Sequence, residues 1–153
     1  MTEYRPLFPT NVEVSDDVKD FIPRFYATSD DPSKNEEWVG YFTEDATLIM
    51  GDKTARGHDE IRSLRRGMWE KVASRKHKPE RVFPAAFGES LSSSAGNGVG
   101  SEHEYMLCGS LDFVMKTGEK AVATWSGRAV LKDVKGHGLQ YSFYQVYLHT
   151  RPA

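Results

Sequence analysis

Cysteine is almost absent from this sequence, since Cys108 is the single one among 153 residues. One thiol excludes an intramolecular disulfide and any zinc or redox site that needs a pair of cysteines. We expect Cys108 to be a small buried residue, because no base stands near it in the sequence. The five histidines are scattered and show none of the spacings typical of metal ligands. The sequence therefore predicts neither a metal site nor a cofactor.

Long apolar runs and a strong net charge are also lacking. No run approaches the roughly 20 apolar residues that a membrane-spanning helix needs, and the first residues do not follow the pattern of a signal peptide. The formal net charge is −2, which gives nucleic acid no overall attraction. We therefore expect a cytoplasmic protein that binds neither a membrane nor nucleic acid.

Aromatic side chains, by contrast, are plentiful, with eight Phe, seven Tyr and three Trp. A chain of this length forms about one domain and buries roughly two-thirds of the surface of its unfolded chain. So many aromatic rings are more than a disordered chain would carry. They could fill a core or line a cavity.

Positive charge is concentrated in residues 62–81, which hold eight Lys or Arg against Glu70 and Glu80. Charge runs of this kind are usually solvated helix faces or strand edges. The alternative is a docking surface for an acidic partner or an anionic ligand. The glycines of residues 96–100 do not form a phosphate loop, because no Lys-Ser/Thr follows them.

Helical periodicity is confined to the first half of the chain. Residues 1–13 have none and predict an arm, whereas apolar residues at helical spacing over 18–25 predict the first helix. The spacing of a capping box opens a short second helix over 33–42. The apolar stripe over 61–72 predicts a third helix, which we expect to extend to Arg75 because basic residues favour a helix C-terminus.

Strand-like alternation dominates the second half, after a first short strand over 47–50. The expected strands are residues 77–87, 104–116, 119–132 and 139–150, with a Gly/Ser-rich loop over 88–102. Tight connections between the last three predict an antiparallel meander. Helices followed by strands indicate one α+β domain over 14–150, with the helices on one face of a curved sheet.

Two short motifs resemble those of a known superfamily. Phe42-x-x-Asp45-Ala46 and, after it, Gly57-x-x-x-Ile61 are similar to the motifs of NTF2-like proteins, and within them the SnoaL-like proteins of polyketide cyclase, ketosteroid isomerase and scytalone dehydratase type. The resemblance implies an NTF2-like cone, in which three N-terminal helices pack on a strongly curved, mostly antiparallel sheet that encloses an apolar pocket.

The function implied by this resemblance is that of a small-molecule-binding protein of secondary metabolism. It would be a cofactor-independent isomerase, cyclase or dehydratase acting on an apolar, polyketide- or terpenoid-like metabolite. The alternative is a non-catalytic ligand-binding or protein-docking module, because one fold hosts many functions. Both faces of the last strand are apolar, which in this superfamily implies a homodimer through the outer face of the sheet.

Three proton carriers are the candidate catalytic residues. His77 opens the strand after the third helix, where similar dehydratases have a cavity histidine, and imidazole titrates near neutral pH; otherwise it is a surface residue of the basic run. Asp52 follows the first strand, in the region of the isomerase base, or it is a turn residue. Asp31, with Asp30, stands where the dehydratases have a cavity carboxylate, or it caps a helix.

Five aromatic residues are the expected wall of the pocket. On the last two strands, successive side chains point to opposite faces of the sheet, so Trp125 and the residues next to it lie on opposite faces. The sequence does not tell which of the two faces lines the pocket. The expected substrate-binding residues are Tyr26, Trp38, Trp69, Trp125 and Tyr144.

Overall fold

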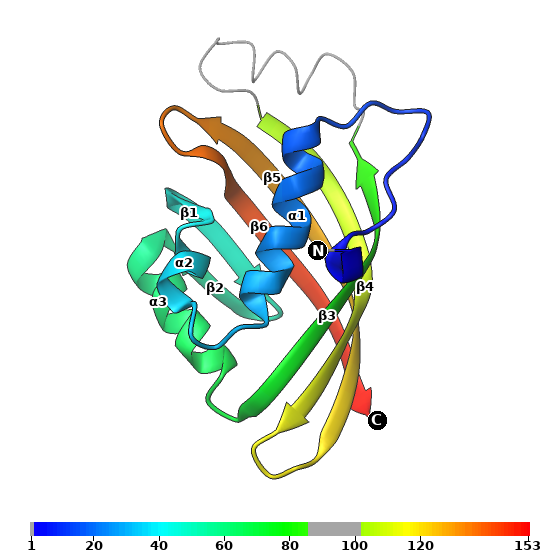
Figure 1. The fold of residues 1–153 in the computed structure, drawn as a ribbon. Helices are drawn as coiled ribbons and strands as arrows, with labels where there is room; N and C mark the ends of the chain where they lie inside the picture. The colour runs from blue at the N-terminus through cyan, green and yellow to red at the C-terminus, as the bar shows by residue number, and fades with distance from the viewer. Residues whose placement is uncertain (1, 86–101) are drawn as a thin grey trace.

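The computed structural model describes residues 2–85 and 102–153, in which a six-stranded sheet packs with three α-helices (Figure 1). The sheet has the order β2-β1-β6-β5-β4-β3 and is not closed. Its strands are β1 (Phe42–Met50), β2 (Lys53–Arg56), β3 (Val72–Pro84), β4 (Glu102–Met115), β5 (Lys120–Val134) and β6 (Gly138–Pro152). The helices are the 3-10 turn η1 (Thr2–Tyr4), α1 (Asp16–Ser29), α2 (Asn35–Val39) and α3 (Gly57–Met68).

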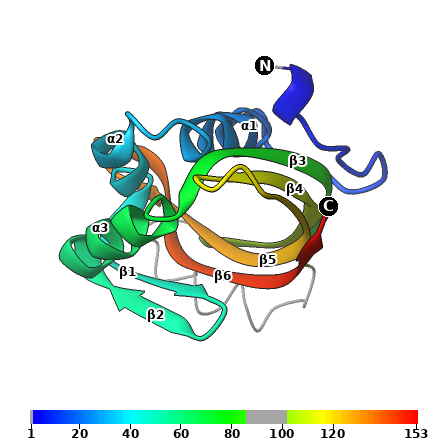
Figure 2. The ribbon, with the colours of Figure 1, turned by 90° about the horizontal axis from the view of Figure 1, so that it is seen from below.

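The expected meander is confirmed, because β4, β5 and β6 pair antiparallel in succession. β3 adds to β4 antiparallel, whereas β1 pairs parallel with β6 and carries β2 on its other side. Figure 2 shows that β3 to β6 curl strongly, with α1, α2 and α3 along the open side of the curl. The expected α+β class and the curved, mostly antiparallel sheet are therefore confirmed.

Helix α1 begins at a side-chain cap and buries one stripe of apolar residues. The Ser15 hydroxyl accepts a hydrogen bond from the Val18 N–H at 3.4 Å, which satisfies one of the free donors at the helix start. Phe21, Ile22 and Phe25 are buried behind it. The helix lies across the concave side of the sheet (Figure 1), so its C-terminal end reaches the interior of the curl.

The second helix is shorter than expected and its capping box does not form. The Ser33 hydroxyl donates to Asp31 Oδ1 at 2.6 Å, so it is not available to cap the helix. Helix α2 begins at Asn35 and spans five residues. Its Trp38 is nevertheless buried, as the sequence indicated, and its indole N–H donates to the Ser29 hydroxyl at 2.8 Å.

The third helix ends at Met68, so the expectation that it extends to Arg75 is wrong. Val72 pairs with Met115 and opens β3, which begins five residues earlier than expected. Long-range pairing with β4 therefore outcompetes the helical spacing of Val72. β3 lies at the sheet edge, where Pro79 and Pro84 are tolerated because one side of the strand needs no donor. The Gly/Ser-rich loop predicted over 88–102 lies, except for its last residue, outside the described residues.

The predicted arm is docked on the sheet edge. The Leu7 N–H donates to the Glu80 carbonyl at 2.8 Å, and the Val82 N–H donates to the Leu7 carbonyl at 3.1 Å. Phe8 packs against the hydrophobic core. Part of the free edge of β3 is thereby covered, which limits edge-to-edge association.

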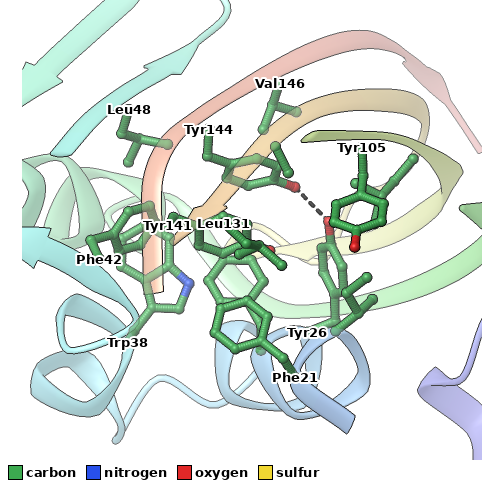
Figure 3. Packing of buried hydrophobic residues seen from close by; sticks show 14 of the residues in the cluster. Phe21, Tyr26, Trp38, Phe42, Leu48, Tyr105, Leu131, Tyr141, Tyr144 and Val146 are labelled. Carbon is green, nitrogen blue, oxygen red and sulfur yellow. Dashed lines mark hydrogen bonds between the residues drawn. The ribbon is translucent and has the colours of Figure 1, made fainter. Parts of the chain in front are cut away.

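An aromatic core fills the space between α1, α2 and β6 (Figure 3). The ring of Phe25 lies at its centre, 4.8 Å from Tyr141 and 5.9 Å from Trp38, measured between ring centroids. Phe42 and Phe21 complete the cluster, at 5.3 Å and 5.0 Å from Tyr141. Edge and offset contacts of this kind add to the free energy gained by burial alone.

The basic stretch of residues 62–81 does not form a single surface patch. Arg62 pairs with Glu36 on the surface, Lys76 with Glu3 and Lys78 with Asp112. Arg65 and Arg75, two further arginines of the stretch, point into the protein. Cys108 is half-buried and faces away from Leu107 and Gly109, on the outer side of β4.

Candidate functional site

A cavity of about 650 Å³ lies inside the curl of the sheet, beside the aromatic core. Its wall is mostly apolar and comes from α1, α3, the β1–β2 turn and the inner faces of β3 to β6. Along β5 the inner face is the one that carries Trp125, and along β6 the one that carries Tyr144. The polar and aromatic lining of the cavity includes Tyr26, Asp52, Arg75, His77, Trp125 and Tyr144.

His77 and Asp30 form a hydrogen-bonded pair at the wall of this cavity. The two atoms His77 Nδ1 and Asp30 Oδ1 are 2.6 Å apart, and Asp30 Oδ2 accepts a second hydrogen bond from the His77 backbone N–H at 2.8 Å. An ionised carboxylate only accepts hydrogen bonds, so Nδ1 carries the proton. Nε2 then has its lone pair free, and no described residue hydrogen-bonds to it.

Both members of the pair are nearly inaccessible to solvent, with side chains 12% and 6% exposed. Burial lowers the pKa of His77 below its ordinary value, because the charged imidazolium is poorly solvated there. The Asp30 carboxylate opposes this shift, whereas the positive charges of Arg75 and Arg65 add to it. His77 is therefore neutral at pH 7 and can accept a proton.

Two phenols meet beside this histidine (Figure 3). The hydroxyl oxygens of Tyr26 and Tyr144 are 2.6 Å apart, and the ring centroid of Tyr26 lies 5.1 Å from that of His77. Burial raises the pKa of both phenols, so both are neutral. One hydroxyl donates to the other, which leaves a second O–H in the pair to donate elsewhere.

Arg75 lies on the same face of β3 as His77, two residues before it, and also lines the cavity. Its Nη2 donates to the Met68 carbonyl at 2.7 Å, and its guanidinium lies over the rings of Trp69 and Phe113. Burial lowers the pKa of Arg75 to about 10, and Asp30 partly opposes this shift. The guanidinium is still charged at neutral pH.

The structure places most, but not all, of the sequence-predicted site residues at this cavity. His77, Tyr26, Trp38, Trp125 and Tyr144 line it. Asp52 also lines it, but the residue is exposed and belongs to the β1–β2 turn, where the cavity meets solvent.

Asp31 and Trp69 do not line the cavity. The Asp31 carboxylate accepts hydrogen bonds from the N–H and hydroxyl of Ser33, so it holds the turn between α1 and α2 and caps neither helix. Asp30 is the carboxylate that meets His77. Trp69 follows α3 as its C-cap residue, and the guanidinium groups of Arg65 and Arg75 both lie over its ring.

Arg75 was missed as a site residue because the apolar spacing of Val72 extended the predicted third helix past it. The signal that could have found it is the alternation from Arg75 to His77, which puts both on one face of a strand. No group of three or more potential metal ligands occurs within residues 2–85 and 102–153.

Comparison with solved structures identifies the architecture. The chain is similar to a provisionally assigned scytalone dehydratase from Novosphingobium aromaticivorans, with a TM-score of 0.73, 11% identity, and coverage of 90% of this chain and 86% of the other. The chain has the NTF2-like cone fold. Hexachlorocyclohexane dehydrochlorinase LinA-type3 from Novosphingobium barchaimii also has this cone, with a TM-score of 0.71, 8% identity and coverage of 90% and 88%. Nuclear transport factor 2 from Cryptosporidium parvum has this cone as well, with a TM-score of 0.63, 14% identity, and coverage of 86% of this chain and 90% of the other.

The structural similarity establishes the NTF2-like cone, but at such low sequence identities it does not establish an activity. No protein-family model and no curated protein matches the sequence. None of the described helices is long and apolar enough to cross a membrane.

Proposed function

We propose that the protein is a cofactor-independent dehydratase or isomerase that acts on an apolar carbonyl compound, with His77 as its base. The observation that carries this proposal is the His77–Asp30 pair. The Asp30 carboxylate holds the proton on Nδ1, so Nε2 has a free lone pair at the wall of an apolar cavity. A general base of this kind contributes roughly 10²–10⁴-fold to a rate.

The reaction begins with proton transfer from carbon. Nε2 of His77 takes a proton from the carbon next to the substrate carbonyl, and the C–H electron pair moves to the carbonyl oxygen. In an isomerisation, the imidazolium returns the proton to a different carbon. In a dehydration, the enolate electron pair expels a β-hydroxyl group, which takes the proton from the imidazolium and leaves as water.

The phenol pair stabilises the charge that develops on the carbonyl oxygen. The free O–H of Tyr26 or Tyr144 donates to that oxygen, and the hydrogen bond between the two phenols strengthens this donor. Such a donor is worth most where charge appears only in the transition state. No hydrogen bond joins Asp52 to His77 in the described structure, so Asp30 orients the imidazole.

Aromatic side chains favour a flat, ring-containing substrate, such as a polyketide- or terpenoid-like metabolite. Trp125 and Phe25 offer ring faces and edges to it, and Leu111 adds aliphatic wall. The similarity of the fold to that of a dehydrochlorinase, an enzyme of elimination chemistry by its name, supports this proposal.

A direct test uses a β-hydroxytetralone, a bicyclic β-hydroxyketone whose dehydration gives a naphthol with its own absorbance. We expect the wild-type protein to form naphthol and His77→Gln to form it at least about a hundredfold more slowly. His149→Gln, at an exposed position of β6, is the matched control and should keep the wild-type rate. Wild-type turnover in His77→Gln would contradict the role of His77.

Deuterium exchange into unsubstituted tetralone from heavy water tests the proton transfer without any leaving group. The wild-type protein should catalyse exchange at the carbon beside the carbonyl, and His77→Gln should not. Absence of catalysed exchange across a set of cyclic ketones would instead support a non-catalytic binding module, the second candidate. The NTF2-like fold of a nuclear transport factor is the observation that favours this second candidate.

We further propose a cytoplasmic homodimer formed through the outer face of the sheet. Phe83 and Met106, which are register partners on β3 and β4, are exposed there, as is Tyr147 on β6. Exposed apolar residues on one face are typical of a protein interface. Sedimentation should show a dimer that Met106→Asp and Tyr147→Asp together convert to a monomer; a wild-type monomer would contradict this proposal.

A further inference from the structure

Arg75 is a half-buried cation whose hydrogen-bond donors the described residues do not fully satisfy. Among the described residues, the Met68 carbonyl is the one hydrogen-bond acceptor for its guanidinium. Its Nε is buried without any partner. Its Nη1 also has no partner among the described residues, but this atom is not buried and is open to the cavity. The indole N–H of the adjacent Trp69 is also buried and unpartnered.

A guanidinium at an apolar wall with a buried, unpaired Nε and an unpaired Nη1 is only partly solvated, so an anion that reaches it is bound favourably. Arg75 has no carboxylate within ion-pair distance among the described residues, and Asp30, which acts on it from farther away, is already bound to His77. The rings of Phe113 and Trp69 contact the guanidinium but accept no second strong hydrogen bond. The free edge formed by Nη1 and the second hydrogen of Nη2 suits a carboxylate.

The free edge of the Arg75 guanidinium lies on the same face of β3 as His77, the proposed base. Residues two apart on one face of a strand are separated by about 7 Å, roughly the width of a fused pair of rings. The other charged groups at the cavity are Asp52 and Lys53, both exposed at its opening. Their opposite charges offset each other, and the Asp30 carboxylate behind His77 stands against the two guanidinium groups of Arg65 and Arg75, so one positive charge remains unbalanced inside.

We propose that the substrate carries a carboxylate, bound by the Arg75 guanidinium, on an apolar ring system whose reacting carbon lies beside His77. This inference rests on the proposed function and narrows its substrate class. The ligand is then not wholly apolar: its ring contacts the aromatic wall, and its anionic group meets the one cation inside the cavity.

The test compares a carboxylate with its neutral ester, using naphthoate and methyl naphthoate as probes. Calorimetry or the fluorescence of the cavity tryptophans would give the two dissociation constants. We expect the wild-type protein to bind naphthoate at least about tenfold more tightly, a difference of about 1.4 kcal/mol. Arg75→Met should abolish this preference while leaving the affinity for the ester within about threefold.

Lys53→Met is the matched control, because it removes the exposed cation at the same cavity. It should keep the tenfold preference. A wild-type protein without the preference, or an Arg75→Met variant that retains it, would overturn the inference. If Arg75→Met does not fold, the melting temperature of the wild-type protein still decides: naphthoate should raise it more than the ester does, and equal shifts would overturn the inference.

These outcomes are separate from those of the proposed function. His77→Gln should still prefer naphthoate over its ester even though it no longer catalyses proton transfer. Loss of the preference with catalysis intact would refute the carboxylate class alone. Intact preference without any turnover by the wild-type protein would refute the catalytic proposal alone.

Discussion

Arg65 is fully buried and Arg75, ten positions further along the chain, is half-buried, and the protein treats the two arginines differently. Burial lowers the pKa of each to about 10. The Arg65 guanidinium donates to the carbonyls of Ser29 and Asp31 at 2.8 Å and 2.7 Å. It also donates to the side-chain oxygen of Asn35 at 2.8 Å and to the Thr28 carbonyl at 3.3 Å. Arg75 has the Met68 carbonyl as its single described acceptor.

The difference separates a structural charge from one available to a ligand. Arg65 ties the end of α1 to the start of α2, so its hydrogen bonds define the turn that presents Asp30. Arg75 lies at the wall of an apolar cavity with unused donors. A charged side chain whose donors are all paired within the protein stabilises the fold. A charged side chain that keeps unpaired donors at a cavity wall has them available for a ligand.

The largest expected effect is the loss of stability in Arg65→Met. Removing the guanidinium leaves several buried carbonyls without a donor, and each such group typically costs about 1–3 kcal/mol. Urea unfolding followed by circular dichroism would measure this loss. A loss under about 1 kcal/mol would show that the two arginines do not differ as described.

The tyrosines allow the same comparison with neutral groups. Tyr26→Phe leaves the buried Tyr144 hydroxyl without its partner and should destabilise the fold by about 1–3 kcal/mol. Tyr141→Phe is the matched control, because the buried Tyr141 hydroxyl has no partner among the described residues. That variant should be neutral or more stable in the same unfolding experiment; equal losses would contradict the assignment.

A smaller effect is expected from pH, through His77. Its pKa in the folded protein is lowered below 6.5, whereas in the unfolded chain it has its ordinary value. The unfolded state therefore binds more protons within this window, and stability falls as the pH drops from about 6.5 towards the folded-state pKa. The slope from one such group is at most about 1.4 kcal/mol per pH unit. Unfolding measured across this range should lose that component in His77→Gln.

The smallest change in stability is expected for Arg75→Met. An apolar side chain of similar length replaces a charge that has one acceptor, so the free energy of unfolding should change by less than about 1 kcal/mol or increase. The contrast with Arg65→Met, measured under the same conditions, is the informative quantity. A loss as large as that of Arg65→Met would make Arg75 a structural residue.

The sequence predicted the sheet more accurately than the site. Alternation along 104–150 and the tight turns between the strands were enough to predict the meander, because local patterns set strand pairing there. The Phe42 motif indicated the cone. The end of α3 was missed because pairing of Val72 with Met115 is long-range, and no local signal reports it.

The site was only partly predictable for the same reason. His77 was named from its place at the start of a predicted strand, where similar dehydratases have a cavity histidine. Of the five aromatic residues expected in the wall, Trp69 does not line the cavity. The pairing of His77 with Asp30, not Asp31, depends on how α1 ends, since one residue further along the chain the carboxylate points to Ser33. Adjacent aspartates in a turn cannot be told apart without that geometry.

The protonation of His77 tests the account most directly, because every proposed step needs a neutral imidazole with a free Nε2. Nitrogen NMR of the His77 ring, titrated in the wild-type protein, reports both the tautomer and the pKa. The account predicts a proton on Nδ1, an unprotonated Nε2 at pH 7, and a pKa below 6.5. A pKa above 6.5, or a proton on Nε2 at neutral pH, would contradict it.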